Sequence, residues 1–247
     1  MGSDYSTLQL FTGKTPPTIA RQALLKAVVA QLSAEGFQPI AQKTQFHNRV
    51  VVIGPAEDRP WLSIYDSCGS RDEDSEFELL YEYREFIALA QNMSAQVGPV
   101  VRIDVDDGCA LKFRLFADGK QVDQYADQPT IGEGMYLGGW SDEKRLANRS
   151  RPKVWGQHLQ LSSDQMKQLR QIWPRFQQDQ RVYTGRILSN TAELLGWNKR
   201  FARTGYAIGA DGIPVHYSVP LSYAGVDLAG FTELYFYREK SAEKDKS

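Results

Sequence analysis

Apolar and polar side chains alternate most regularly between residues 99 and 125. In residues 101–105 the valines and the isoleucine fall on one side of an extended chain, and charged residues fall on the other. Residues 109–115 repeat this pattern, and a third run continues to Tyr125. A period of two is typical of strands with one buried face. The sequence therefore predicts a meander of three antiparallel strands over residues 99–125.

The first turn of the meander contains two aspartates followed by a glycine. Directly opposed residues of antiparallel strands share a face, so apolar positions must oppose apolar positions. A three-residue loop at 106–108 meets this condition and gives its glycine the left-handed position that such loops need. The predicted pairs are Ile103 with Leu111 and Val101 with Phe113.

The second turn is predicted as a two-residue turn at 118–119, because Asp-Gly suits the left-handed backbone angles of a type I′ turn. The predicted pairs are Leu115 with Val122 and Arg114 with Asp123. The second pair would bring opposite charges together on the polar face.

A helix is predicted before Gly36, because residues 19–32 are rich in Ala, Leu and Val. Thr15 is the expected N-cap, and two prolines occupy the first turn. The predicted apolar stripe consists of Leu25, Val28 and Leu32. A second long helix is predicted over 74–96, where apolar residues recur at intervals of three and four.

These elements, with further strands predicted at 50–53 and 61–65, indicate an α+β fold. Two long helices are expected on one face of a mainly antiparallel sheet. Helical insertions are predicted from Ser162 to Pro174 and over 187–195, followed by a β-rich C-terminal segment. The last strand, at 231–238, is apolar on both sides and is therefore expected inside a sheet or docked between layers.

The 247 residues are expected to form one domain over 1–240. A subdivision into 1–127 and 153–240 is the alternative, because a glycine-rich stretch separates these parts. Residues 241–247 are expected to be a disordered tail.

The net charge of −1 provides no global attraction to nucleic acid or to an anionic membrane. No apolar run approaches the length of a transmembrane helix, and residues 1–30 do not show the pattern of a signal peptide. The sequence therefore predicts a cytoplasmic protein with no membrane association.

Asp66, Asp104 and Asp106 are the candidate metal ligands. Asp66 follows one apolar strand, and the other two lie at the end of another. If these strands are neighbours, the three carboxylates could converge and hold Mg²⁺ or Mn²⁺. The sequence favours a structural role for these aspartates over metal binding, because turns and solvent-facing strand positions commonly use aspartate.

A locally basic segment contains the candidate interface or anion-binding residues. These residues are Trp140, Arg145, Arg149, Arg151 and Lys153. With Trp155 also nearby, charge and stacking could together hold phosphate or single-stranded nucleic acid. Neighbouring acidic residues weaken the case for phosphate or nucleic-acid binding. The preferred interpretation is that the basic segment forms a solvated face or makes ion pairs with the acidic residues of the meander.

The sequence contains none of the common catalytic signatures. Its 12 Tyr, 11 Phe and 5 Trp would favour an interface wherever they are exposed. We therefore expect a non-catalytic interaction or regulatory protein without a cofactor, whose partner is a protein rather than nucleic acid. The alternative is a metal-dependent enzyme of phosphoryl or glycosyl transfer that uses the three aspartates.

Overall fold

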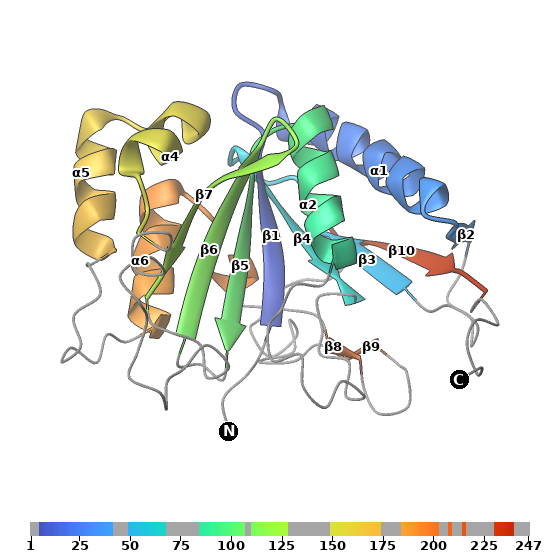
Figure 1. Ribbon diagram of the computed structural model, residues 1–247. Helices are drawn as coiled ribbons and strands as arrows, with labels where there is room; N and C mark the ends of the chain where they lie inside the picture. The colour runs from blue at the N-terminus through green and yellow to red at the C-terminus, as the bar shows by residue number, and fades with distance from the viewer. Residues whose placement is uncertain are drawn as a thin grey trace.

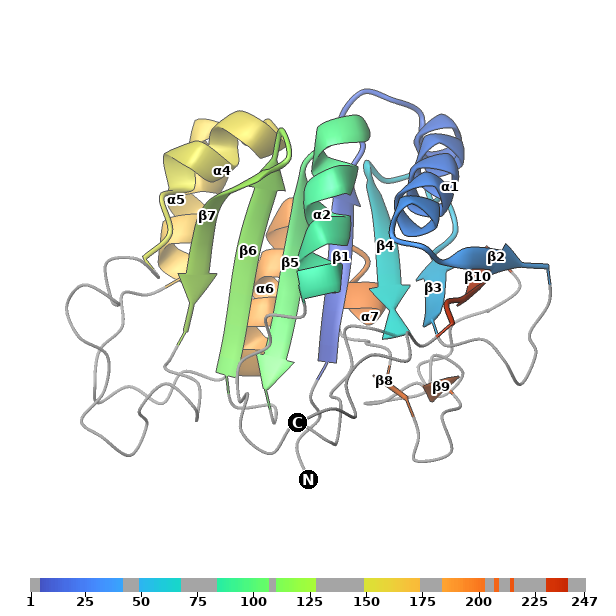
Figure 2. The same cartoon turned by 45° about the vertical axis from the view of Figure 1, so that its right-hand side comes forward.

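The computed structural model describes residues 5–41, 49–67, 84–106, 110–127, 149–173, 184–202, 207–208, 214–215 and 230–239. At its centre is an antiparallel sheet of eight strands with helices on both faces (Figure 1, Figure 2). The strand order is β2-β10-β3-β4-β1-β5-β6-β7. This mixture of helices and an antiparallel sheet confirms the predicted α+β class.

The strands of this sheet are β1 (Tyr5–Phe11), β2 (Gln38–Ile40), β3 (Arg49–Ile53), β4 (Trp61–Asp66), β5 (Val100–Asp106), β6 (Ala110–Ala117), β7 (Lys120–Ala126) and β10 (Thr232–Tyr237). Two shorter strands, β8 (Ala207–Ile208) and β9 (Pro214–Val215), pair with each other separately.

Strand β1 is central, because it pairs with β4 on one side and with β5 on the other. Leu8 lies opposite Ile64, and Leu10 lies opposite both Leu62 and Val100. These five side chains are almost completely buried. They point to the face covered by α1 and α2, which we call the front face.

The front layer consists of α1 (Pro17–Ala34) and α2 (Arg84–Gln96). Pro16 is the N-cap residue of α1, and no side chain caps this end, so the prediction of Thr15 as the cap is wrong. The buried stripe of α1 contains Leu24, whereas the predicted Leu25 is only partly buried. The predicted beginning of the second helix lies outside the described residues.

The rear layer contains α4 (Pro152–Leu159), α5 (Ser163–Ile172), α6 (Thr184–Leu195) and the short α7 (Lys199–Ala202). Aromatic rings fill the space between these helices and the sheet. The ring of Trp173 stacks on that of Tyr125 at 4.8 Å and meets the edge of Trp155 at 4.7 Å. Such contacts between large buried rings fix the helices on the sheet.

Helices α4 and α5 pack closely at Gly156. A Cβ added to this glycine would overlap Met166 Sδ and lie 2.9 Å from Met166 Cγ. A larger residue here would therefore force the side chain of Met166 to move, since protein interiors are close-packed.

The first turn of the meander has a different register from the predicted one. Ile103 lies opposite Phe113, and Val101 lies opposite Leu115. Asp106 stays in β5 and pairs with Ala110, so it is not a loop residue. The register differs by two residues, which leaves every side chain on its expected face. The alternation of faces alone could not separate the two registers.

The second turn has left-handed angles at Asp118 and Gly119, with φ values of +50° and +76°. A β-bulge follows in β7, where Val122 is an extra residue: the neighbouring residues Leu115 and Phe116 of β6 lie opposite Asp123 and Gln121. Leu115 consequently lies opposite Asp123 rather than Val122, and the prediction that Arg114 pairs with Asp123 is also wrong. The bulge turns Asp123 to the rear face, because a one-residue shift reverses the face of a side chain.

Candidate functional site

Asp66 is fully buried at the end of β4 and binds the guanidinium of Arg49. Arg49 Nη2 donates to Asp66 Oδ2 at 2.7 Å, and Arg49 Nε donates to Asp66 Oδ1 at 3.2 Å. Arg49 also contacts Glu35 Oε2 at 3.1 Å. Two-point binding of this kind gives a carboxylate a fixed orientation.

Asp104 lies on β5, separated from β4 by β1. Its Oδ1 accepts hydrogen bonds from Ser6 Oγ at 2.6 Å and from Arg102 Nε at 2.7 Å. Arg114 Nη1 lies 3.6 Å from Asp104 Oδ2. Burial acts to raise the pKa of Asp104, but the two guanidinium groups and the hydrogen bonds outweigh it and hold that pKa below 3.8.

The candidate metal ligands are thus surrounded by the chain's own cations at two of the three positions. The side chain of Asp106 lies outside the described part of the chain. Among the described residues, no group of three His, Cys, Asp or Glu side chains is arranged to hold a metal ion. Binding of Mg²⁺ or Mn²⁺ at Asp66, Asp104 and Asp106 therefore remains a prediction from the sequence.

The rear helices and residues 149–151 carry an excess of positive charge. Residues 149–173 and 184–202 contain eight Lys and Arg residues against one Asp and one Glu, a net charge of +6. The whole chain has a net charge of −1, so the remaining residues carry −7. We call these rear helices, with residues 149–151, the basic layer.

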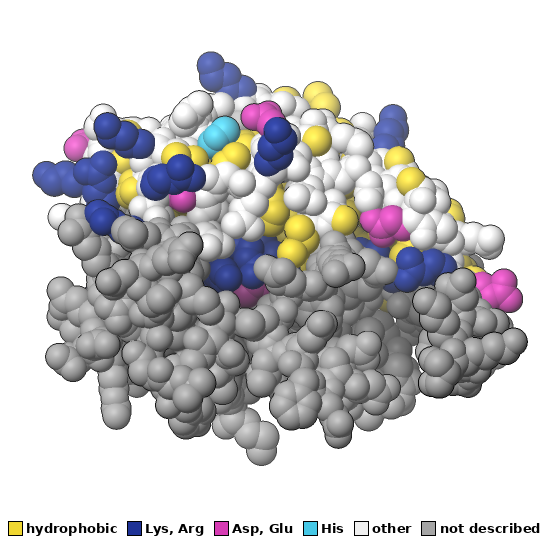
Figure 3. Space-filling view, in the orientation of Figure 1, with side chains coloured by type: hydrophobic (Ala, Val, Ile, Leu, Met, Phe, Trp, Pro, Cys, Tyr) yellow, Lys and Arg dark blue, Asp and Glu magenta, His cyan; other side chains and the backbone are white. Residues whose placement is uncertain are grey.

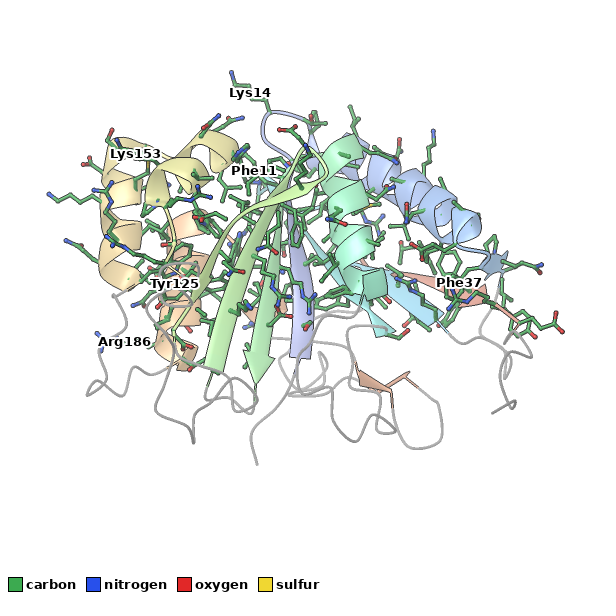
Figure 4. The ribbon with its side chains drawn as sticks, in the orientation of Figure 1. Phe11, Lys14, Phe37, Tyr125, Lys153 and Arg186 are labelled. Atoms are coloured by element: carbon green, nitrogen blue, oxygen red, sulfur yellow. The ribbon has the colours of Figure 1, made fainter. Side chains whose placement is uncertain are left out.

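Five exposed cations of the basic layer form no ion pair with a described residue. They are Arg149, Lys153, Lys167, Arg170 and Arg186. Figure 3 shows Lys and Arg side chains gathered over α4 and α5. Lys153 and Arg186, labelled in Figure 4, both lie on the side of the molecule formed by α4, α5 and α6.

Asp123 of β7 attaches the basic layer to the sheet. Its Oδ2 accepts from the backbone N–H of Arg151 at 2.6 Å and from Trp155 Nε1 at 2.8 Å. Arg151 Nε donates to Oδ1 at 3.1 Å. Of the two alternatives expected for this basic segment, a solvated face or ion pairs with the meander, Arg151 follows the second and makes an ion pair with Asp123.

A second aspartate, Asp127, makes a similar attachment beyond the end of β7. It accepts from the backbone N–H of Leu111 at 2.8 Å and from Thr184 Oγ1 of α6 at 2.8 Å. The basic layer is therefore held at α4 and at α6 by buried hydrogen bonds to carboxylates, which are stronger than neutral hydrogen bonds.

The structure places the other sequence-predicted interface residues as follows. Arg149 and Lys153 are exposed, whereas Trp140 and Arg145 lie outside the described residues. Trp155 is completely buried, so it cannot stack on a base. The sequence did not indicate Lys167, Arg170 or Arg186, because these residues join the basic segment only through the packing of α5 and α6.

None of the helices in the described ranges is both long and apolar enough to cross a membrane. Comparison with known proteins finds no matching family model, no matching curated protein and no matching solved structure.

Proposed function

We propose that the protein is a non-catalytic binding protein that holds an acidic protein partner against its basic layer. The observation that carries this proposal is the set of five exposed cations without an ion-pair partner among the described residues. Four of these cations lie on helices α4, α5 and α6, and Arg149 precedes α4. Asp123 and Asp127 anchor this layer to the sheet at α4 and at α6. A charged surface held in one place can be complementary to an acidic surface and speeds association with it.

A compact acidic protein fits this surface better than nucleic acid. The described residues outside the basic layer are nearly neutral, with 11 Lys and Arg residues against 12 Asp and Glu residues. A folded acidic partner can pair with the cations of the layer alone. The tryptophans of the layer, Trp155 and Trp173, are buried and provide no platform for unstacked bases.

The surface also indicates what kind of complex to expect. The described residues of the basic layer expose no large hydrophobic side chain. Apolar contacts normally supply the buried centre of a stable protein interface. We therefore expect a complex that forms rapidly and weakens steeply as salt is added.

The test compares wild type with the triple variant Lys153→Glu, Lys167→Glu, Arg170→Glu. The probe is a fluorescently labelled poly-L-glutamate peptide, and the measurement is fluorescence anisotropy at low and physiological salt. We expect the triple variant to lose at least about tenfold in affinity, because six units of charge change on one surface. The matched control, Lys14→Glu, Lys26→Glu, Lys120→Glu, has the same charge change on exposed residues elsewhere.

Two results would overturn the proposal. Equal loss of binding in both triple variants would show that net charge, rather than the basic layer, determines binding. Tighter binding of a DNA duplex of about 20 base pairs than of the peptide at equal salt would identify nucleic acid as the partner, since phosphate contacts would then dominate.

A further inference from the structure

Two arginines lie side by side under the front layer. Arg102 of β5 and Arg114 of β6 are directly opposite each other, and both are buried, with exposures of 0% and 4%. The guanidinium of Arg102 lies over the ring of Phe86, near the beginning of α2, with its Cζ 5.0 Å from the ring centre. We call these two residues the arginine pair.

The arginine pair is energetically unfavourable by itself. Like charges directly opposite each other in a sheet are destabilising, and buried charges need acceptors. Asp104 is the carboxylate that both arginines contact, and its Oδ1 is already used by Ser6 and Arg102. Lys112, directly opposite Asp104, is half-buried and adds a further positive charge.

Hydrogen bonding in this group is incomplete at Arg114 and at the facing carboxylate oxygen, Asp104 Oδ2. Arg114 Nη1 is buried, makes no hydrogen bond within the described structure and lies 3.6 Å from Asp104 Oδ2. An Arg guanidinium has five N–H donors in a fixed planar arrangement, which matches the oxygens of a phosphate group. A buried donor without an acceptor within hydrogen-bond distance is destabilising, and a bound anion would supply that acceptor.

We propose that Arg114, with Arg102 and Lys112 beside it, binds a phosphate group on the front face of the sheet. The group could belong to inorganic phosphate or to a phosphate monoester, because both offer the same oxygens. Figure 3 shows Lys and Arg side chains with an acidic side chain beside them over β5 and β6, apart from those over α4 and α5. The site lies on the face opposite to the basic layer and is independent of the proposed protein partner.

The experiment measures binding by calorimetry and by thermal unfolding of the full chain. Inorganic phosphate and phosphoserine are titrated separately, and sodium chloride at equal ionic strength is the reference. We expect a saturable rise in the melting temperature of wild type with phosphate, because a ligand of the native state stabilises it by mass action. A stronger effect of phosphoserine than of phosphate identifies a monoester as the ligand.

Two variants locate the site. Arg114→Gln removes the guanidinium, and Lys112→Gln is a milder change at a half-buried position in case the first variant does not fold. Each should weaken phosphate binding at least about tenfold, which corresponds to one charge-assisted hydrogen bond. Arg170→Gln, on the basic layer, is the matched control and should leave phosphate binding unchanged.

A melting temperature that rises no more with phosphate than with chloride would overturn the inference. So would phosphate binding that survives Arg114→Gln and Lys112→Gln but is lost in Arg170→Gln. In that case the basic layer would hold the phosphate, and Arg114 would have only a structural role. Neither result bears on binding of the poly-L-glutamate probe, so the two proposals can fail separately.

Discussion

The indole of Trp155 on α4 donates a 2.8 Å hydrogen bond to the carboxylate of Asp123 on β7. This contact exists because the bulge at Val122 of β7 moves Asp123 to the rear face. A regular hairpin would place Asp123 opposite Arg114, on the front face. A single inserted residue in β7 thus determines how the basic layer is attached to the sheet.

Replacing Asp123 should therefore loosen this attachment. We expect Asp123→Ala to lower the free energy of unfolding by about 1–3 kcal/mol, because the buried Trp155 Nε1 loses its acceptor. Arg151 adds little to this loss, since its side chain is 64% exposed and can be solvated. Urea unfolding measures the change. The control Asp58→Ala, at an exposed position, should stay within about 0.5 kcal/mol of wild type, and an equally small change in Asp123→Ala would contradict the prediction.

Acid should weaken the structure partly through Asp104, whose pKa in the folded chain is below its ordinary value. A lowered pKa means that the ionised group contributes stability above about pH 4, and that this contribution is lost as the pH falls through the folded pKa. Asp104→Asn lacks the contribution at every pH. We expect the variant to be less stable than wild type by about 3–5 kcal/mol near neutral pH, because two arginines lose their shared carboxylate.

The measurement for Asp104 is the unfolding free energy of wild type and variant from about pH 7 down to about pH 3. The difference between the two proteins should narrow as the pH falls below about 4. A difference that stays constant over this range would show that Asp104 stabilises the fold through its shape rather than through its charge.

The close approach of α4 and α5 can be tested at Gly156. Gly156→Ala should destabilise the protein by about 1–3 kcal/mol through overlap with Met166, although alanine is the better helix former. Combining it with Met166→Ala makes room for the new methyl group, so the double variant should lose less stability than the two single variants added together. Chemical unfolding of all four proteins gives the interaction energy, and strict additivity would show that the two residues do not compete for space.

The sequence was most informative where a short pattern has one physical solution. The meander residues Val101 and Ile103 lie on one face as expected, and β10, which is apolar on both sides, lies inside the sheet between β2 and β3. Turn chemistry also located the left-handed residues Asp118 and Gly119. These features depend on the nearest neighbours along the chain and on side-chain periodicity.

The register and the sites depend on contacts that the sequence pattern does not show. A two-residue slip preserves the faces of β5 and β6, and no residue type marks the bulge at Val122 of β7. The basic layer forms because α5 and α6 place Arg170 and Arg186 on the same side of the molecule as Lys153. Arg114 looked like an ordinary solvent-facing strand residue, because the alternating pattern does not show that α2 covers this face.

The position of β10 has a consequence for how the chain is made. In the described sheet, β2 has no strand partner except β10, whose pairing joins Ile40 to Tyr235. A nascent chain must therefore carry β2, and one edge of β3, without their partner strand until residues 232–237 have been synthesised. Unpaired strand edges invite pairing with other chains. Strand β10 joins β2 to β3 in this sheet, and a ribosome stalled before residue 232 would hold a chain with an open edge.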